Sequence, residues 1–247
     1  YNGWSNLLDQ ITDLRDTDNA PADVYYYGIH NANSGGLLGL GWVGGQSQVW
    51  SRTAIGVGWT GETAPETAVH ELGHNHGRDH SPCGVSGDPA YPHSGASIGV
   101  WGYSASQHKL LSPNEYVDFM SYCSPQWVSD WTYIALFNRA KVVSSQPYIY
   151  VPPELLDRSY DRIKVIEDQA WIKDRKTLHR PPDGEPRDVI VTLSDGSQTT
   201  LSGHYFAYNH FEGGLLYVMR PANWGRQLSP VSYTFQAEGR GFVVANH

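Results

Sequence analysis

The sequence predicts an α+β fold in two parts, a mixed α/β part over residues 1–146 and a small antiparallel β part over residues 147–247. Two observations lead to this prediction. In the first part, apolar residues recur at helical spacing between short β-branched runs. After a proline-containing linker near residue 147, the chain shows only short alternating runs around turn signals, which is typical of a β-sandwich.

The first part opens with a predicted helix over residues 4–14, where Trp, Leu and Ile recur at helical spacing. The β-branched and aromatic run DVYYYGIHN, residues 23–31, predicts a strand. The alternation in QSQVWS, residues 46–51, predicts an edge strand, and AIGVGW, residues 54–59, predicts another strand. Residues 81–119 are rich in Gly, Ser and Pro and predict a long structured loop.

The best-marked helix is predicted over residues 63–76. Thr63 can cap its start, Glu66 can close a capping box, and Gly77 supplies a left-handed stop. A further helix is predicted from residue 129 to about residue 141, with Trp131, Ile134, Ala135 and Phe137 as its buried face.

The second part shows six short runs that predict strands, with an Asp195-Gly196 turn after the first. The runs cover residues 188–193, 198–203, 204–209, 214–220, 231–236 and 241–246.

Composition excludes several classes of protein. The chain has 17 Lys and Arg against 25 Asp and Glu, a net charge of -8 without a basic cluster, which excludes nucleic acid as the main partner. Its 9 Trp, 16 Tyr and 6 Phe exclude a disordered chain. No apolar run approaches the roughly 20 residues of a membrane helix. Because the chain starts at Tyr1, we expect it to be a processed or trimmed piece.

The string that carries chemistry is HELGHNHGRDH, residues 70–80. On a helix, His70 and His74 share one face and can bind one metal ion, while Glu71 can reach a water at that metal without ligating it. Gly77 ends the helix and lets the chain bring back His80. Three imidazoles with an open position are the arrangement of catalytic zinc.

This eleven-residue pattern resembles the extended motif HExxHxxGxxH of the metzincin zinc endopeptidases. Downstream, Asp118-Phe-Met-Ser-Tyr122 resembles the metzincin Met-turn, in which a methionine, here Met120, lies beneath the zinc-binding histidines. The resemblance covers about residues 1–141. It implies a mixed twisted sheet, an edge strand that pairs with substrate, an active-site helix, and a C-terminal helix after the Met-turn.

The resemblance also implies the chemistry of a zinc endopeptidase that hydrolyses protein or glycoprotein substrates. One Zn²⁺ would be held by His70, His74 and His80, and Glu71 would act as general base. In the astacin and serralysin branches, a tyrosine two residues after the methionine is a reversible zinc ligand. Tyr122 has that place here, with packing under the site as the alternative.

Substrate contacts are expected at two places. The resemblance implies an extended substrate paired with an edge strand, for which we expect the run around Val49. It also implies that the segment after the Met-turn lines the pocket beyond the scissile bond, so Gln126 and Trp127 are candidate substrate-binding residues.

The two cysteines are placed by the same resemblance. Cys83 follows His80 by three residues and Cys123 follows Met120 by three, so a zinc site formed by His80 and Met120 brings the cysteines near one another. We expect a Cys83–Cys123 disulfide and therefore a secreted, extracellular protein, with free cysteines as the alternative.

The sequence also departs from the metzincin plan, and it leaves other functions open. Metzincins usually have strands before and after the first helix, whereas here only Asn19-Ala20 separates helix from strand, so part of the sheet is missing or supplied by another segment.

One alternative to a zinc endopeptidase is a binding or adhesion protein with a vestigial zinc site, whose β part would bind glycan or protein. A site with Glu115 in place of His80 is another. Aromatic residues of the β part form either a docking face or its core: Tyr205, Phe206, Tyr208, Phe211, Tyr217 and Trp224.

Overall fold

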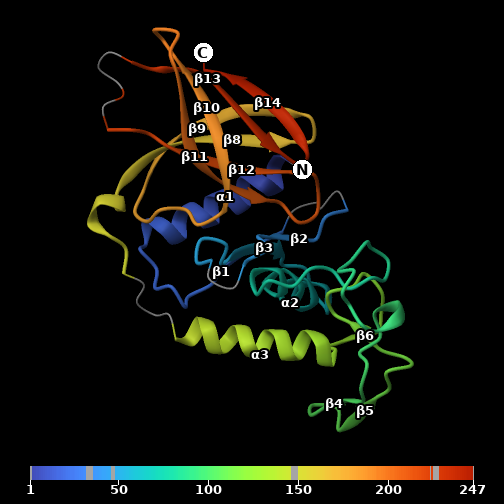
Figure 1. Ribbon diagram of the computed structural model, residues 1–247. Coiled ribbons are helices and arrows are strands. Elements are labelled where there is room, and N and C mark those ends of the chain that lie inside the picture. Colours follow the sequence, from blue (N-terminus) through green and yellow to red (C-terminus); the bar gives the residue numbers. More distant parts are fainter. Residues whose placement is uncertain are drawn as a thin grey trace. The chain divides into compact units, whose positions relative to one another are not determined.

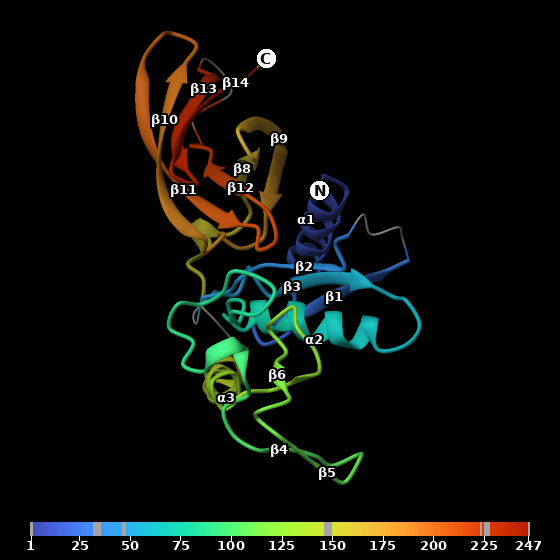
Figure 2. The ribbon, with the colours of Figure 1, turned by 90° about the vertical axis from the view of Figure 1, so that its right-hand side faces the viewer.

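The computed structural model describes residues 2–31, 36–45, 48–145, 150–222, 224 and 228–246, and it is a mixed α+β protein rich in strands (Figures 1 and 2). Its contacts divide the chain into two units. The helix–sheet unit consists of Ala22–Ser47 and Arg52–Pro147. The β unit consists of Tyr1–Pro21, Gln48–Ser51 and Tyr148–His247. The division near residue 147 lies where the composition changes, but residues 1–21 and 48–51 lie with the C-terminal strands.

The helix–sheet unit contains a three-stranded sheet in the order β1-β3-β2. β1 (Tyr26–His30) runs parallel to β3 (Thr53–Val57), and β2 (Gly39–Gly41) runs antiparallel to β3. Helix α2 (Thr63–Asn75) packs on β3 and β2. The sheet therefore presents its antiparallel edge strand to the helix that carries the histidine motif.

The remaining elements of this unit lie in the long loop and after it. The loop holds a 3-10 turn at Ser94–Ala96, the hairpin of β4 (Gly102–Ser104) and β5 (Lys109–Leu111), and β6 (Val117–Asp118). β6 pairs in parallel with β7 (Gln126–Trp127), and helix α3 (Asp130–Ser144) follows.

The predicted strand over residues 46–51 is wrong for its described part, because residues 48–51 form a turn. The Asp183 carboxylate accepts hydrogen bonds from the backbone N–H of Val49 at 2.6 Å and of Trp50 at 3.2 Å. The buried Trp50 ring packs against Phe206 and Tyr217. The backbone N–H of Val49 is thus already bonded, so Val49 does not offer the strand pairing expected for substrate. The antiparallel edge strand of the three-stranded sheet is β2, inside the glycine-rich passage NSGGLLGLGWVGG, residues 33–45 of the sequence.

Two details of the helices also differ from expectation. α2 begins at Thr63 itself, and its N-cap is Glu62, whose side chain makes no capping hydrogen bond. In α3, the side chains of Ile134 and Phe137 are 58% and 52% exposed, so the predicted buried face is wrong there. The buried positions of α3 are instead Thr132, Arg139 and Val143. Ser129 caps α3 by accepting the Thr132 N–H at 3.0 Å.

The β unit is built on one seven-stranded antiparallel sheet, so the predicted two-sheet sandwich is wrong. Its order is β14-β13-β10-β11-β12-β8-β9, and the end strands β14 and β9 contact each other. The sheet curls into a half-barrel and encloses its own apolar core. The strands are β8 (Arg158–Ile166), β9 (Gln169–Leu178), β10 (Glu185–Leu193), β11 (Gln198–Ala207), β12 (Gly213–Met219), β13 (Pro230–Ala237) and β14 (Arg240–Ala245).

The core of this half-barrel comes from the side chains on the concave face. It is formed by Ile163, Val165, Val189, Val191, Leu193, Tyr205, Leu216, Val218, Tyr233, Phe235, Ala237, Phe242 and Val244. Four of the six aromatic residues considered for docking are buried: Tyr205, Phe206, Tyr208 and Tyr217. These four side chains therefore pack inside the unit, and their buried rings are not available for contact with a glycan.

Helix α1 (Asn2–Thr17) carries aspartates at helical spacing that pair with basic residues of β8 and β9. Asp9, which is fully buried, lies 3.0 Å from the Lys164 ammonium and 2.5 Å from that of Lys173. Asp13 pairs with the buried Arg162 at 2.6 Å. Within the β unit, these ion pairs attach α1 to the sheet at β8 and β9.

Within the described residues, no helix combines the length and the apolar character needed to cross a membrane.

Candidate metal centre

Helix α2 places His70, Glu71 and His74 on its buried face, where they are 9%, 2% and 1% exposed. The helix ends as predicted. His76 is its C-cap residue, and Gly77 has a φ of +79°. A Cβ at Gly77 would lie 2.5 Å from the Gly44 carbonyl oxygen, so both the left-handed backbone and the close approach require glycine.

The turn at Gly77 brings His80 back to the histidines of α2. The three side chains each offer a nitrogen within 4.8 Å of the others. The Nε2 atoms of His70 and His74 are 3.2 Å apart. Two imidazole nitrogens on one tetrahedral zinc ion, each about 2.0–2.1 Å from the metal, would be about 3.3 Å apart. The donor set therefore fits a metal ion, because imidazole nitrogen is a ligand that zinc prefers.

Backbone carbonyls fix the orientation of two of these rings. His70 Nδ1 lies 3.0 Å from the carbonyl oxygen of Phe119, and His74 Nδ1 lies 2.6 Å from that of Arg78. Since a carbonyl oxygen only accepts, both Nδ1 atoms carry the proton and both Nε2 atoms present a lone pair. Such outer hydrogen bonds hold metal-binding histidines in position. The sequence motif alone did not reveal these two carbonyls.

Met120 is fully buried and lies against α2. A Cβ at Gly73 would lie 2.3 Å from the Met120 sulfur, so the sulfur lies directly against the helix at Gly73. Gly73 is thus the residue that allows this close contact.

Asp118 organises the segment around Met120, a role that we did not predict. Its carboxylate accepts hydrogen bonds from the Met120 N–H at 2.9 Å, the Ser81 hydroxyl at 3.0 Å and the Ser129 N–H at 2.9 Å. The Ser81 N–H in turn donates to the Met120 carbonyl at 3.0 Å. Because Ser81 directly follows His80, this one buried carboxylate ties the third histidine, the methionine segment and the start of α3 together.

We expect the Asp118→Asn protein to bind its metal about 10–100-fold more weakly than the wild type. An asparagine would replace one of the two acceptor oxygens with a donor NH₂ group, which would face either the donors of Ser81 and Met120 or that of Ser129. Metal affinity is measured by competition with a chromophoric chelator. Asp130→Asn, which changes a partly exposed carboxylate paired with His93, is the matched control. An Asp118→Asn protein with wild-type affinity would contradict this role.

The predicted disulfide is confirmed, because Cys83 and Cys123 are bonded across a sequence separation of 40 residues. The Tyr122 N–H also donates to the Cys83 carbonyl at 2.9 Å. In the loop-entropy model, a bridge of this length stabilises the fold by about 4 kcal/mol. It joins the chain after His80 to the chain after Met120.

Tyr122 lies beside the histidines. Its ring centroid is 5.0 Å from that of His80 and 5.8 Å from that of His70, and the residue is 52% exposed. Partial burial, with a further contribution from the negative charge of Glu71, raises the pKa of Tyr122 to about 12. The phenol is therefore protonated at neutral pH and can donate a hydrogen bond.

Strand β2 passes directly over Glu71. A Cβ at Gly39 would lie 2.5 Å from Glu71 Oε1 and 2.7 Å from Thr67 Cγ2. Any larger residue at Gly39 would displace the carboxylate. The antiparallel edge strand of the sheet thus runs next to the residue predicted as the base.

The other predicted site residues have different surroundings. Gln126 donates from its side-chain amide to the Ser121 carbonyl at 2.9 Å and thereby braces the segment after Met120. Trp127 lies against Gly102, where a Cβ would be 2.8 Å from its ring. Among the described residues, Glu115 does not belong to the cluster that could hold a metal, so the site does not need it in place of His80.

Residues 26–126 match the model of the Peptidase M66 family. The matched range includes all three histidines, Glu71 and Met120. Peptidase M66 is a metallopeptidase family, so the match supports a peptidase that acts on protein substrates. Neither a curated protein nor a solved structure matched the chain.

Proposed function

We propose that this protein is a secreted zinc endopeptidase of the metzincin type, which hydrolyses peptide bonds in protein or glycoprotein substrates. The observation that carries the proposal is the convergence of His70, His74 and His80 beside the buried Glu71. The match of residues 26–126 to Peptidase M66 supports it independently of this geometry. A structural metal site needs no buried carboxylate next to its ligands, so Glu71 favours catalysis over a vestigial site.

The histidines would hold the zinc ion through their Nε2 atoms, and a zinc ion supplies Lewis acidity, which polarises a carbonyl and acidifies water. Glu71 accepts the proton of the attacking water and then delivers it to the leaving amine. Tyr122, which stays protonated at neutral pH, donates a hydrogen bond to the oxyanion that develops on the scissile carbonyl.

The substrate would lie extended along β2, in place of the run around Val49. β2 is an edge strand of its sheet, and Gly39 brings its backbone against Glu71. Main-chain pairing along such an edge gives affinity with little dependence on the substrate sequence. Gln126 and Trp127 follow the Met120 segment, and we place them at the pocket beyond the scissile bond, where the Trp127 ring would limit its depth.

The proposal of a secreted protein is supported by the Cys83–Cys123 disulfide. Disulfides form and persist in oxidising compartments such as the extracellular space, and they are rare in the cytosol.

Removal and return of the metal test the proposed function. We expect excess 1,10-phenanthroline to abolish cleavage of unstructured casein. After the chelator has been dialysed away, about one equivalent of Zn²⁺ should restore it, because three neutral imidazoles prefer zinc over hard cations. Mg²⁺ serves as the control and should restore nothing. Cleavage that persists in chelator, while zinc analysis shows a metal-free protein, would reject the metallopeptidase.

A further inference from the structure

We infer that the helix–sheet unit holds a second binding site, a pocket for a carboxylate ligand with an apolar body. The pocket lies between the turn that ends α2 and the facing side of α3, and its volume is about 550 Å³. Ligand pockets in proteins commonly measure about 300–1,000 Å³, so this one can hold a small organic molecule. None of its lining residues is a metal ligand or Glu71.

The charge of the pocket favours an anion. Its lining includes His76, Arg78 and Arg139 but no Asp or Glu, although the chain as a whole has a net charge of -8. Arg139 is only 2% exposed, and a guanidinium remains charged when buried. The two arginines therefore give the pocket a positive potential.

Arg78 is the side chain best placed to receive the anion. Its guanidinium forms a long ion pair with Asp88, at 3.8 Å, which is beyond hydrogen-bond distance. Its Nε atom is buried and has no hydrogen-bond partner among the described residues. A guanidinium offers two parallel donors that match the two oxygens of a carboxylate. The Arg78 Cζ atom also lies 5.8 Å from the centre of the Trp131 ring, which keeps the guanidinium beside an aromatic wall.

The apolar part of the pocket lining explains why we propose an organic ligand and not an inorganic anion. It is formed by Trp131, Ile134 and Ala135 of α3. Ile134 is 58% exposed, so an apolar group in the pocket would cover surface that is otherwise in water. A ligand with a carboxylate bound to Arg78 and an aryl or alkyl group packed against α3 would use both the charged and the apolar part of the pocket lining.

The pocket is connected to the metal centre through Arg78. Arg78 lines the pocket, and its backbone carbonyl oxygen accepts a hydrogen bond from the Nδ1–H of His74 at 2.6 Å. A ligand that orders this residue also holds His74 in its metal-binding orientation, so an occupied pocket should raise the zinc affinity. This second step rests on the proposed function, whereas the binding itself does not.

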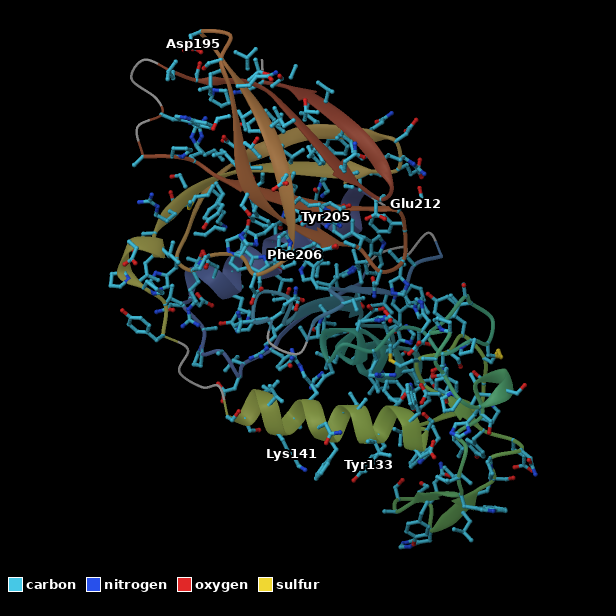
Figure 3. The ribbon with its side chains drawn as sticks, viewed as in Figure 1. Tyr133, Lys141, Asp195, Tyr205, Phe206 and Glu212 are labelled. Atoms are coloured by element: carbon cyan, nitrogen blue, oxygen red, sulfur yellow. A yellow bond between two sulfur atoms is a disulfide. The ribbon has the colours of Figure 1, made fainter. Side chains whose placement is uncertain are left out.

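The test uses 4-phenylbutyrate as the probe, titrated into the purified protein by calorimetry with Trp fluorescence as a second readout. We expect saturable binding of one probe molecule, no comparable binding of 4-phenylbutylamine, and at least about tenfold weaker binding to Arg78→Gln, since a hydrogen bond to a charged group contributes about 1.5–3 kcal/mol. Lys141→Gln is the matched control, because Lys141 is a cation of α3 that contacts Phe137 and does not line the pocket. Figure 3 shows Lys141 and Tyr133 projecting from α3.

A carboxylate can also ligate zinc, so the titration is repeated with a peptide hydroxamate bound at the metal centre. Displacement of the probe by the hydroxamate would overturn the proposal that the probe binds in this pocket. Equal affinity of the wild type and Arg78→Gln for the probe would overturn it as well. Saturable binding with an unchanged zinc affinity would overturn only the connection to His74. None of these readouts needs peptidase activity, so failure of the pocket and failure of the proposed function are distinguishable.

Discussion

Replacing Glu71 with glutamine is expected to reduce kcat/KM on unstructured casein by about 10²–10⁴-fold while zinc remains bound. The amide is nearly the size of the carboxylate and should occupy the same place under β2, but it cannot accept the proton of the attacking water. His70, His74 and His80 are unchanged in this protein, so the metal content should stay at one ion per chain.

Glu66→Gln is the control for this prediction, because Glu66 is an exposed residue in the first turn of the same helix. It should cleave casein like the wild type. Metal content and kinetics are measured on the same preparations. If Glu71→Gln holds zinc and cleaves at the wild-type rate, Glu71 is not the base, and the proposed mechanism is wrong.

Replacing Asp9 with alanine is expected to lower the free energy of unfolding by about 3–5 kcal/mol. Asp9 is fully buried, and its carboxylate lies 3.0 Å from the ammonium of Lys164, which is itself buried. Without Asp9, that ammonium would be left in a site of low dielectric with its main ion-pair partner removed. The expected loss is a large fraction of the about 5–15 kcal/mol that stabilises an ordinary domain. Denaturant unfolding followed by circular dichroism measures it.

A matched control and a rescue separate this ion pair from general damage to α1. Asp157, whose side chain is 71% exposed, pairs with His179, and Asp157→Ala should change stability by less than about 1 kcal/mol. The double variant Asp9→Leu with Lys164→Met replaces the buried charges by apolar groups and should recover much of the loss. An Asp9→Ala protein as stable as Asp157→Ala would show that the buried ion pairs do not hold α1 on the sheet.

Local patterns explain which parts of the site could be predicted. The histidine motif depends on helical spacing over one turn and on a glycine that ends the helix, and both are properties of neighbouring residues. α2, the left-handed Gly77 and the convergence of the three histidines were therefore predicted from residues 63–80. The disulfide was predicted because the motif and the Met120 segment each carry a cysteine at a fixed distance.

Long-range contacts explain most of what was missed. β8 and β9 carry charged residues on the face that packs against α1, so they lack the alternation that marks a half-buried strand. Those charges are matched by the aspartates of α1, more than 140 residues away in the sequence. The sequence around Trp50 alternates like a strand, but Asp183 and the aromatic residues of the half-barrel hold it as a turn.

The edge strand β2 and the role of Asp118 were missed for a related reason. β2 lies in a glycine-rich passage for which we predicted no strand, and Gly39 is required there because Glu71 occupies the space that a side chain would need. Asp118 was noted only as the start of the segment around Met120. Its hydrogen bonds to Ser81 and Ser129 join residues that are 37 and 11 positions away.

The measurement that tests the central claim most directly is the zinc content of His80→Ala, determined by elemental analysis beside the wild type and His76→Ala. His76 lies in the same motif but stacks on Tyr25 and bonds to Leu72, so it provides a matched histidine outside the metal cluster. The three-histidine site predicts about one zinc per chain in the wild type and in His76→Ala. In His80→Ala, it predicts that most of the zinc and most of the casein-cleaving activity are lost. A His80→Ala protein that keeps its full zinc and its activity would contradict the site and would point to another third ligand.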